Sequence, residues 1–293
     1  MPICFFITPL GDLSRKNRAT VPRGFRAASA GRFSRPMERA IVRGMSSKRY
    51  PRMEALSPTG QTRVVREIFT TGHERYDSLN HLLSFRQDLG WRAATVKKMR
   101  FERTLRFLDV ATGTADLAIE AARRFPKISV TGIDFAAPML EVGRRKVNDA
   151  GLQERVSLVE GDALALPFPD GSFDVTAVAF GMRNIPDRRR ALDQMARVTV
   201  PGGQVMILEM TFAPTPFFRP FYGFYLMRIL PGIARLFAGN PATYHYLADS
   251  IRHFPSPDDL SGLMKESGLR EVSYTRLTFG VAYLHIGTVP GGA

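Results

Sequence analysis

Short apolar runs alternate with amphipathic stretches along the middle of this chain. Apolar and β-branched residues gather in five short runs, at 105–110, 129–133, 156–160, 173–179 and 204–210. The stretches between them carry apolar residues at the three- and four-residue spacing of a helix, as at 116–124, 138–149 and 188–198. This alternation predicts a mostly parallel sheet with helices on both faces, because parallel strands need crossover connections.

The pattern changes on either side of this alternation. Ahead of it, apolar residues at helical spacing predict helices that lead into the domain. Beyond it, 216–237 is a long aromatic and aliphatic stretch with interleaved arginines, and 244–252 and 256–267 are typical of helices. The last two runs, 272–278 and 281–289, predict two strands that form a C-terminal β-hairpin.

The composition of the 293 residues is that of a globular protein, with 44% hydrophobic and 23% charged residues. A single cysteine excludes a disulfide framework, and the five histidines show no metal-ligand spacing, so we expect no metal site. No apolar run approaches the roughly 18 residues of a membrane span. We therefore expect a cytoplasmic protein, at most peripheral on the inner face of a membrane.

The net charge of +14 is concentrated at the start of the chain. Residues 1–60 hold 12 of the 41 Lys and Arg residues but only 3 of the 27 Asp and Glu residues. We predict a disordered extension there, ahead of one domain at 61–293, and no nucleic-acid partner, because the remainder is only mildly basic. The extension has three interpretations: a transit-like segment, a tether to an anionic membrane, or sequence upstream of a true start at Met45.

Acidic and small residues follow the first three predicted strands. The first strand ends at Asp109 and leads through a small-residue loop around Gly113 into a helix, where backbone amides can approach a ligand closely. Asp134 ends the second strand, where a carboxylate can accept hydrogen bonds from ribose hydroxyls or cap a helix. Asp162 and Ala163 follow the third, as an adenine contact or an Asx-turn. All lie at strand carboxyl ends, where open α/β sheets bind ligands.

These segments together resemble the class I methyltransferases that use S-adenosylmethionine. The acidic-ended first strand, Asp134, Gly-Asp-Ala at 161–163 and Pro-Gly-Gly at 201–203 carry that resemblance. The sequence Phe-Gly-Met-Arg-Asn at 180–184 is similar to the quinone C-methyltransferases, which methylate demethylmenaquinol or the corresponding ubiquinol precursor. The resemblance covers about residues 65–289 and implies a Rossmann-like sheet.

The resemblance also implies roles for individual residues. S-adenosyl-L-methionine would be the cofactor, bound by Asp109, Gly113, Thr114, Asp134, Asp162 and Ala163. Arg183 and Asn184 would lie near a prenylated quinol, with Tyr76 supplied by the N-terminal helices as part of a lid. Two positions depart from the family pattern. Ala115 stands where the family usually has a glycine, which makes the loop tighter by one methyl group, and Ala179 stands where it often has a serine, which removes one possible hydrogen bond to the cofactor.

The resulting prediction is C-methylation of a prenylated demethylquinol, with demethylmenaquinol as the favoured substrate. Arg183 would stabilise the developing phenolate, or it would instead be a structural partner of a carboxylate such as Asp187. Ubiquinone-precursor methylation, methylation of another small phenol and a non-catalytic scaffold in quinone synthesis are the alternatives. We also expect peripheral membrane contact, since arginines interleave with the aromatic stretch. The sequence leaves open whether the protein forms a homodimer.

Overall fold

The computed structural model describes residue 81 and residues 84–212, 215–229 and 241–291. All of these residues belong to one unit of the chain. The predicted extension at 1–60, the predicted domain boundary at residue 61 and Tyr76 lie outside the described residues. Within the described ranges, no helix is long and apolar enough to cross a membrane.

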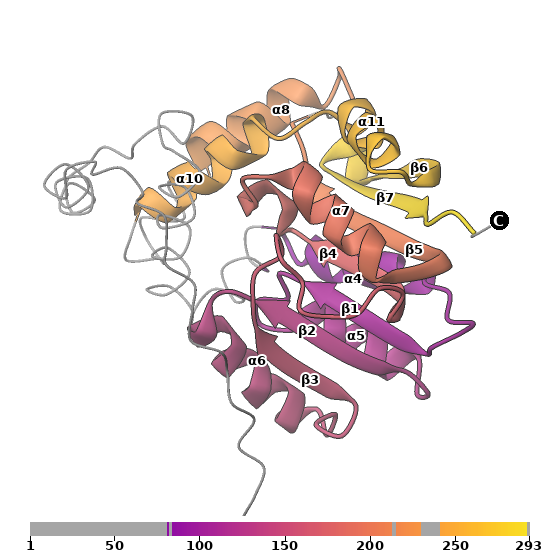
Figure 1. The fold of residues 1–293 in the computed structure, drawn as a ribbon. Coiled ribbons are helices and arrows are strands. Elements are labelled where there is room, and N and C mark those ends of the chain that lie inside the picture. Colours follow the sequence, from indigo (N-terminus) through magenta and orange to yellow (C-terminus); the bar gives the residue numbers. More distant parts are fainter. Residues whose placement is uncertain (1–80, 82–83, 213–214, 230–240, 292–293) are drawn as a thin grey trace, which may run out of the picture. The chain divides into compact units, whose positions relative to one another are not determined.

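Seven strands form one sheet, in the order β3-β2-β1-β4-β5-β7-β6 (Figure 1). The strands are β1 (Arg106–Val110), β2 (Ser129–Asp134), β3 (Val156–Glu160), β4 (Phe173–Ala179), β5 (Thr199–Met210), β6 (Arg270–Leu277) and β7 (Ala282–Thr288). Strands β1 to β5 pair in parallel, and β7 is antiparallel to both of its neighbours. The predicted mostly parallel sheet and the C-terminal hairpin are thus confirmed.

Helices cover both faces of the sheet. One face is covered by α4 (Gln87–Lys97), α5 (Asp116–Arg124) and α6 (Ala137–Asp149), and the other by α7 (Arg188–Val198) and α11 (Pro257–Glu266). Consecutive residues of β1 show the alternation, because Phe107 belongs to the core with α4 and α5, and Leu108 to the core with α7 and α11. The remaining elements are α8 (Arg219–Phe224), a π-helical turn (Tyr225–Ile229) and α10 (Pro241–Arg252).

The second strand of the hairpin, β7, lies inside the sheet between β5 and β6. Its residues are mostly buried, whereas those of β6 are mostly exposed or half-buried. The sequence explains the difference, since β6 carries three charged residues and β7 none. A charged strand at the edge also protects the sheet from pairing with other chains.

The connections between strands change direction next to β1. From β1 the chain moves outward through β2 to β3, and then returns to β4 on the other side of β1 and continues to β5. The loops after β1 and β4 therefore diverge at the carboxyl ends of these strands. Open α/β sheets bind their ligands at such a point.

Candidate active site

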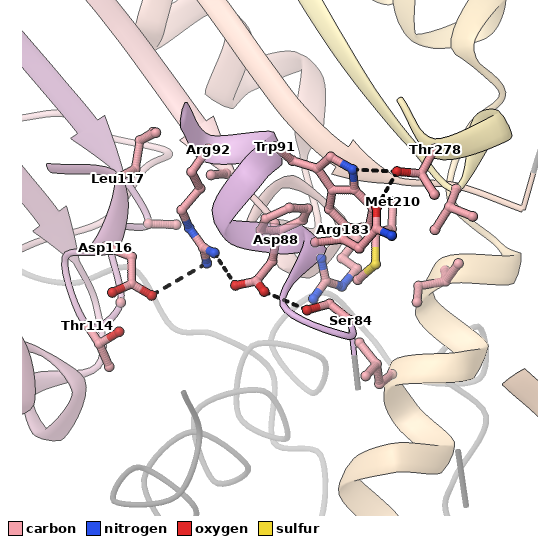
Figure 2. Close-up of a pocket in the computed structure, with 18 of the residues that line it drawn as sticks. Ser84, Asp88, Trp91, Arg92, Thr114, Asp116, Leu117, Arg183, Met210 and Thr278 are labelled. Carbon is pink, nitrogen blue, oxygen red and sulfur yellow. Dashed lines mark hydrogen bonds and ion pairs between the residues drawn. The ribbon is translucent and has the colours of Figure 1, made fainter. Parts of the chain in front are cut away.

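Two cavities adjoin at the carboxyl ends of the strands. The larger, about 350 Å³, is lined by the loop after β1, by α4, α8 and α10 and by the segment after β4 (Figure 2). The smaller, about 280 Å³, is lined by residues that follow β2, β3 and β4. Ala111, Asp134 and Phe135 line both cavities, so the two can hold different parts of one ligand.

The loop after β1 is held in an unusual backbone conformation. Ala111, Gly113 and Ala115 all have positive φ angles, of 52°, 56° and 68°. This region costs a non-glycine residue about 1–2 kcal/mol, so the two alanines store strain that the surrounding packing must hold. The φ of Ala115 explains why glycine suits this position in the resembling family. Here the methyl is fully buried, where a Cβ built on Gly143 of α6 would lie 3.4 Å from it.

Asp134 joins the loop after β1 to the segment after β2. Its two carboxylate oxygens accept hydrogen bonds from the backbone N–H groups of Gly113 and Ala136, both at 2.9 Å. Burial raises the pKa of Asp134, although these amides act in the opposite direction. The N-cap of α6 is Ala136, so Asp134 does not cap this helix. The Phe135 N–H acts on the same carboxylate, and since a carboxylate offers about four lone pairs, one remains for a ligand.

Asp109 is a buried carboxyl group in the wall of the larger cavity. It accepts hydrogen bonds from the Thr112 hydroxyl at 2.6 Å and from the Ala118 backbone N–H at 3.1 Å. Burial raises the pKa of Asp109 to about 7, against the effect of these donors. At neutral pH this carboxyl group is therefore close to half ionised, and a cation in the cavity favours its charged form.

Asp109 is expected to make the free energy of unfolding decrease as the pH rises. The pKa of Asp109 is about 7 in the folded protein against 3.8 for an unperturbed aspartate, so between these two pH values the folded state binds more protons than the unfolded state. The stabilisation of the folded state that comes from protonated Asp109 is complete below about pH 4 and is lost as the pH rises through about 7. Urea unfolding at pH 5 and pH 8 should show wild type losing about 2 kcal/mol more than Asp109→Asn. Equal losses in both proteins would contradict the raised pKa.

Arg183 and Glu209 form a buried ion pair beside the larger cavity. Arg183 lies in the short 3-10 helix Met182–Asn184 after β4, and Glu209 lies near the end of β5. The guanidinium contacts one Glu209 oxygen, and the Arg183 backbone N–H donates to the other at 3.2 Å. The two side chains are only 5% and 1% exposed. Asp187 is not this partner, since it caps α7 by accepting from the Arg190 N–H at 3.0 Å.

Sequence reasoning missed Glu209, although a signal was present. Glu209 is the single charged residue in the apolar run 204–210. An acidic residue in a strand buried on both faces needs a partner, because a lone buried charge is very costly. The partner itself could not be read from the sequence.

The structure separates Asn184 from Arg183. Asn184 lines the smaller cavity with Asp162 and Ala163, while Arg183 lines the larger one. Gly181, just before these residues, lies against the loop after β1, since a Cβ there would lie 2.7 Å from the Ala111 Cβ. Orientation of the quinol by Asn184 therefore lacks support from this geometry and stays a prediction.

Asp162 and Ala163 adjoin Asp134 as the sequence predicted. Asp162 is exposed and accepts a hydrogen bond from the Leu164 N–H at 2.9 Å, so it forms the Asx-turn that was one of its two interpretations. Both residues also line the smaller cavity, so the turn and a ligand contact are compatible. Among the residues that the structure describes, no group of His, Cys, Asp and Glu is arranged to hold a metal ion.

Charged residues of α4 face the loop after β1 across the larger cavity. Arg92 lies between Asp88, at 2.5 Å, and Asp116, at 3.8 Å, as Figure 2 shows. Burial opposes ionisation of Asp88, but a hydrogen bond from Ser84 and the charge of Arg92 hold its pKa below the usual value. Thr114 joins the same network, because Lys146, which pairs with Asp116, donates to the Thr114 hydroxyl at 3.2 Å. Sequence reasoning did not single out α4, since charges on a helix are usually solvated.

Comparison with known proteins identifies the family. Residues 57–289 match the model of the ubiE/COQ5 methyltransferase family. The chain belongs to this family. The match confirms the resemblance inferred from the strand-end motifs and from residues 180–184. The protein is therefore a methyltransferase, and the two cavities are its candidate active site.

Three similar proteins each match about three quarters or more of this methyltransferase. Demethylmenaquinone methyltransferase of Thermus thermophilus is 46% identical over 76% of this chain and 100% of its own length. Ubiquinone/menaquinone biosynthesis C-methyltransferase UbiE of a Geobacter species is 42% identical over 80% of this chain and 100% of its own. A solved SAM-dependent methyltransferase of Thermotoga maritima, 20% identical, covers 76% of this chain and 98% of its own with a TM-score of 0.55. That similarity confirms the fold.

Proposed function

We propose that this methyltransferase C-methylates a prenylated demethylquinol, with S-adenosyl-L-methionine as the methyl donor. The observation that carries the proposal is the larger cavity, which has small and acidic residues on one wall and aromatic residues from α8 on another. The first wall suits a cationic methyl donor, and the second an apolar aromatic acceptor. Demethylmenaquinol is the proposed substrate, because the 46% identical relative is named a demethylmenaquinone methyltransferase.

The residues present fit S-adenosylmethionine. The carboxyl group of Asp109 in the wall of the larger cavity suits a positively charged group of this cofactor. Asp134, which lines both cavities, would bind the ribose between the two. Asp162 and Ala163 would bind the adenine in the smaller cavity. When bound, the cofactor supplies an electrophilic methyl group on its sulfonium sulfur.

The protein's own contribution to the reaction is positioning and electrostatic stabilisation. A phenol carbon becomes nucleophilic when the neighbouring hydroxyl loses its proton, so a fixed positive charge near that oxygen promotes the reaction. Arg183 lines the larger cavity, and Glu209 holds its guanidinium in place. Arginine does not act as the base, because its pKa exceeds about 12. We therefore propose that Arg183 stabilises the phenolate.

The test is methylation by the purified protein of demethylmenaquinol with a short prenyl chain, using labelled S-adenosylmethionine. We expect label in the naphthoquinol ring and little label in a water-soluble phenol. The reverse preference would indicate a methyltransferase of small phenols. No cofactor binding at millimolar concentration would indicate a scaffold. Quinone analysis of a deletion strain separates the remaining alternative, because the accumulating demethyl species identifies the substrate.

Exposed aromatic residues border the larger cavity. Phe217 and Phe224 are 83% and 61% exposed, and Phe221 between them is exposed and lines the cavity. Phe279, also exposed, packs against Phe218 in a tilted arrangement at a centroid distance of 5.6 Å. Apolar side chains in such a group mark an interaction surface. We propose that this surface enters a lipid bilayer, since the proposed acceptor carries an apolar chain that lies in the bilayer.

Replacing Phe217 and Phe224 together with serine is expected to weaken membrane association by about tenfold or more. Full burial of one aromatic ring contributes roughly 1.5–3 kcal/mol, and shallow entry of both rings into the interface should still exceed the roughly 1.4 kcal/mol of a tenfold change. The measurement is co-sedimentation with vesicles of equal parts phosphatidylglycerol and phosphatidylcholine. Tyr274→Ser, at an exposed aromatic of β6 away from both cavities, is the control and should bind as wild type does. Equal binding by the double variant would contradict this surface.

A further inference from the structure

The hydroxyl group of Tyr222 is buried in the wall of the larger cavity. Tyr222 lies on α8 and is 5% exposed. Within the described part of the chain, its hydroxyl oxygen has no hydrogen-bond partner. The ring stacks on Phe212 at a centroid distance of 5.9 Å and on Phe218 at 6.5 Å. Aromatic packing, rather than a polar contact, therefore sets where this hydroxyl lies.

Packing alone does not explain a tyrosine at this position. A buried hydroxyl without a partner loses its hydrogen bonds to water and gains none in return, which destabilises the folded protein. Phenylalanine would stack on Phe212 and Phe218 in the same way without this cost. A ligand in the cavity is the natural source of the missing partner, because the side chain lines that cavity.

The surroundings of Tyr222 include the charged groups that the proposed reaction uses. The charges of Arg183 and Glu209 act on its hydroxyl, as does the neighbouring Tyr225. Burial, the largest effect, and Tyr225 raise the pKa of Tyr222 above its usual value. The hydroxyl therefore stays protonated at neutral pH, so it can donate a hydrogen bond but does not act as a base.

We propose that the Tyr222 hydroxyl binds a ring oxygen of the quinol acceptor and thereby orients the ring toward the methyl donor. This inference rests on the proposed function. An oxygen that receives hydrogen bonds from both Tyr222 and Arg183 is stabilised as the phenolate, which activates the neighbouring ring carbon. Asp134 and Asp162 are assigned to the methyl donor, so Tyr222 adds a hydrogen bond to the methyl acceptor.

Tyr222→Phe tests the proposal, because it removes only the hydroxyl. We expect the KM for demethylmenaquinol with a short prenyl chain to rise about tenfold. The acidic limb of the pH–rate profile should move to higher pH, since the bound quinol loses a donor that favours its ionised form. The Kd for S-adenosylmethionine should stay unchanged, and the Tm should be unchanged or higher.

Tyr283→Phe is the matched control. Tyr283 is a buried tyrosine of β7 that lines neither cavity, so its variant should keep the KM and pH profile of wild type. A wild-type KM and pH profile in Tyr222→Phe would overturn the proposal and leave the proposed function standing. A lower Tm with an unchanged KM would overturn it too, since the hydroxyl would then have a structural partner. Failure of wild type to methylate the quinol would overturn both.

Discussion

Asp134→Ala is expected to weaken S-adenosylmethionine binding by about a hundredfold or more. Asp134 lines both cavities and is the residue we assign to the ribose. A hydrogen bond to a charged acceptor contributes about 1.5–3 kcal/mol, and the upper end of this range accounts for this loss. The substitution also removes the acceptor of the Gly113 and Ala136 N–H groups, so the loop after β1 should loosen. Calorimetric titration measures the affinity, and circular dichroism checks the fold.

Two further variants separate binding from loop geometry. Asp134→Asn keeps the shape of the side chain, but its NH2 group must face one of the two N–H donors, so we expect a loss of about tenfold. Asp170→Ala removes an exposed aspartate that pairs with Arg197 outside both cavities, and should bind the cofactor as wild type does. Unchanged affinity in Asp134→Ala with a normal spectrum would exclude the assigned role.

Arg183→Lys is expected to reduce turnover about a hundredfold while the affinity for S-adenosylmethionine barely changes. Lysine keeps the positive charge beside Glu209 but loses the planar group that can contact this carboxylate and a quinol oxygen together. Loss of one transition-state donor has this magnitude in other enzymes. Steady-state kinetics with short-chain demethylmenaquinol measures it.

Glu209→Gln is the companion variant, because it leaves the guanidinium of Arg183 buried without its countercharge. Breaking a buried pair from one side costs about 3–5 kcal/mol, so this variant should unfold at markedly lower urea concentration than Arg183→Lys. If Arg183→Lys kept normal turnover, Arg183 would serve only the ion pair. If it weakened cofactor binding and turnover equally, neither role would hold.

Most element boundaries follow from local sequence. The bounds predicted for β3, β4, α5 and α7 coincide with the structure. Strand β5 differs, since it starts at Thr199 rather than at residue 204. Pro201, Gly202 and Gly203 are typical of a loop, but the strand continues through them with a shift in register opposite β4. A bulge of this kind is held by pairing with a neighbouring strand, which no local pattern reports.

The sequence alone determined the sheet and the gathering of Asp109, Asp134 and Asp162 at one edge. It could do so because the spacing of apolar residues, which predicts strands and the helices that connect them, is a local property of the chain. Strands connected in this way run parallel, and the carboxyl ends of parallel strands lie at the same edge of the sheet. Only the tertiary structure decided that Arg183 pairs with Glu209, 26 positions away, and that Asn184 faces the other cavity. It alone also left the Tyr222 hydroxyl buried in the cavity wall. Burial and pairing between distant residues arise from packing, which sequence spacing does not record.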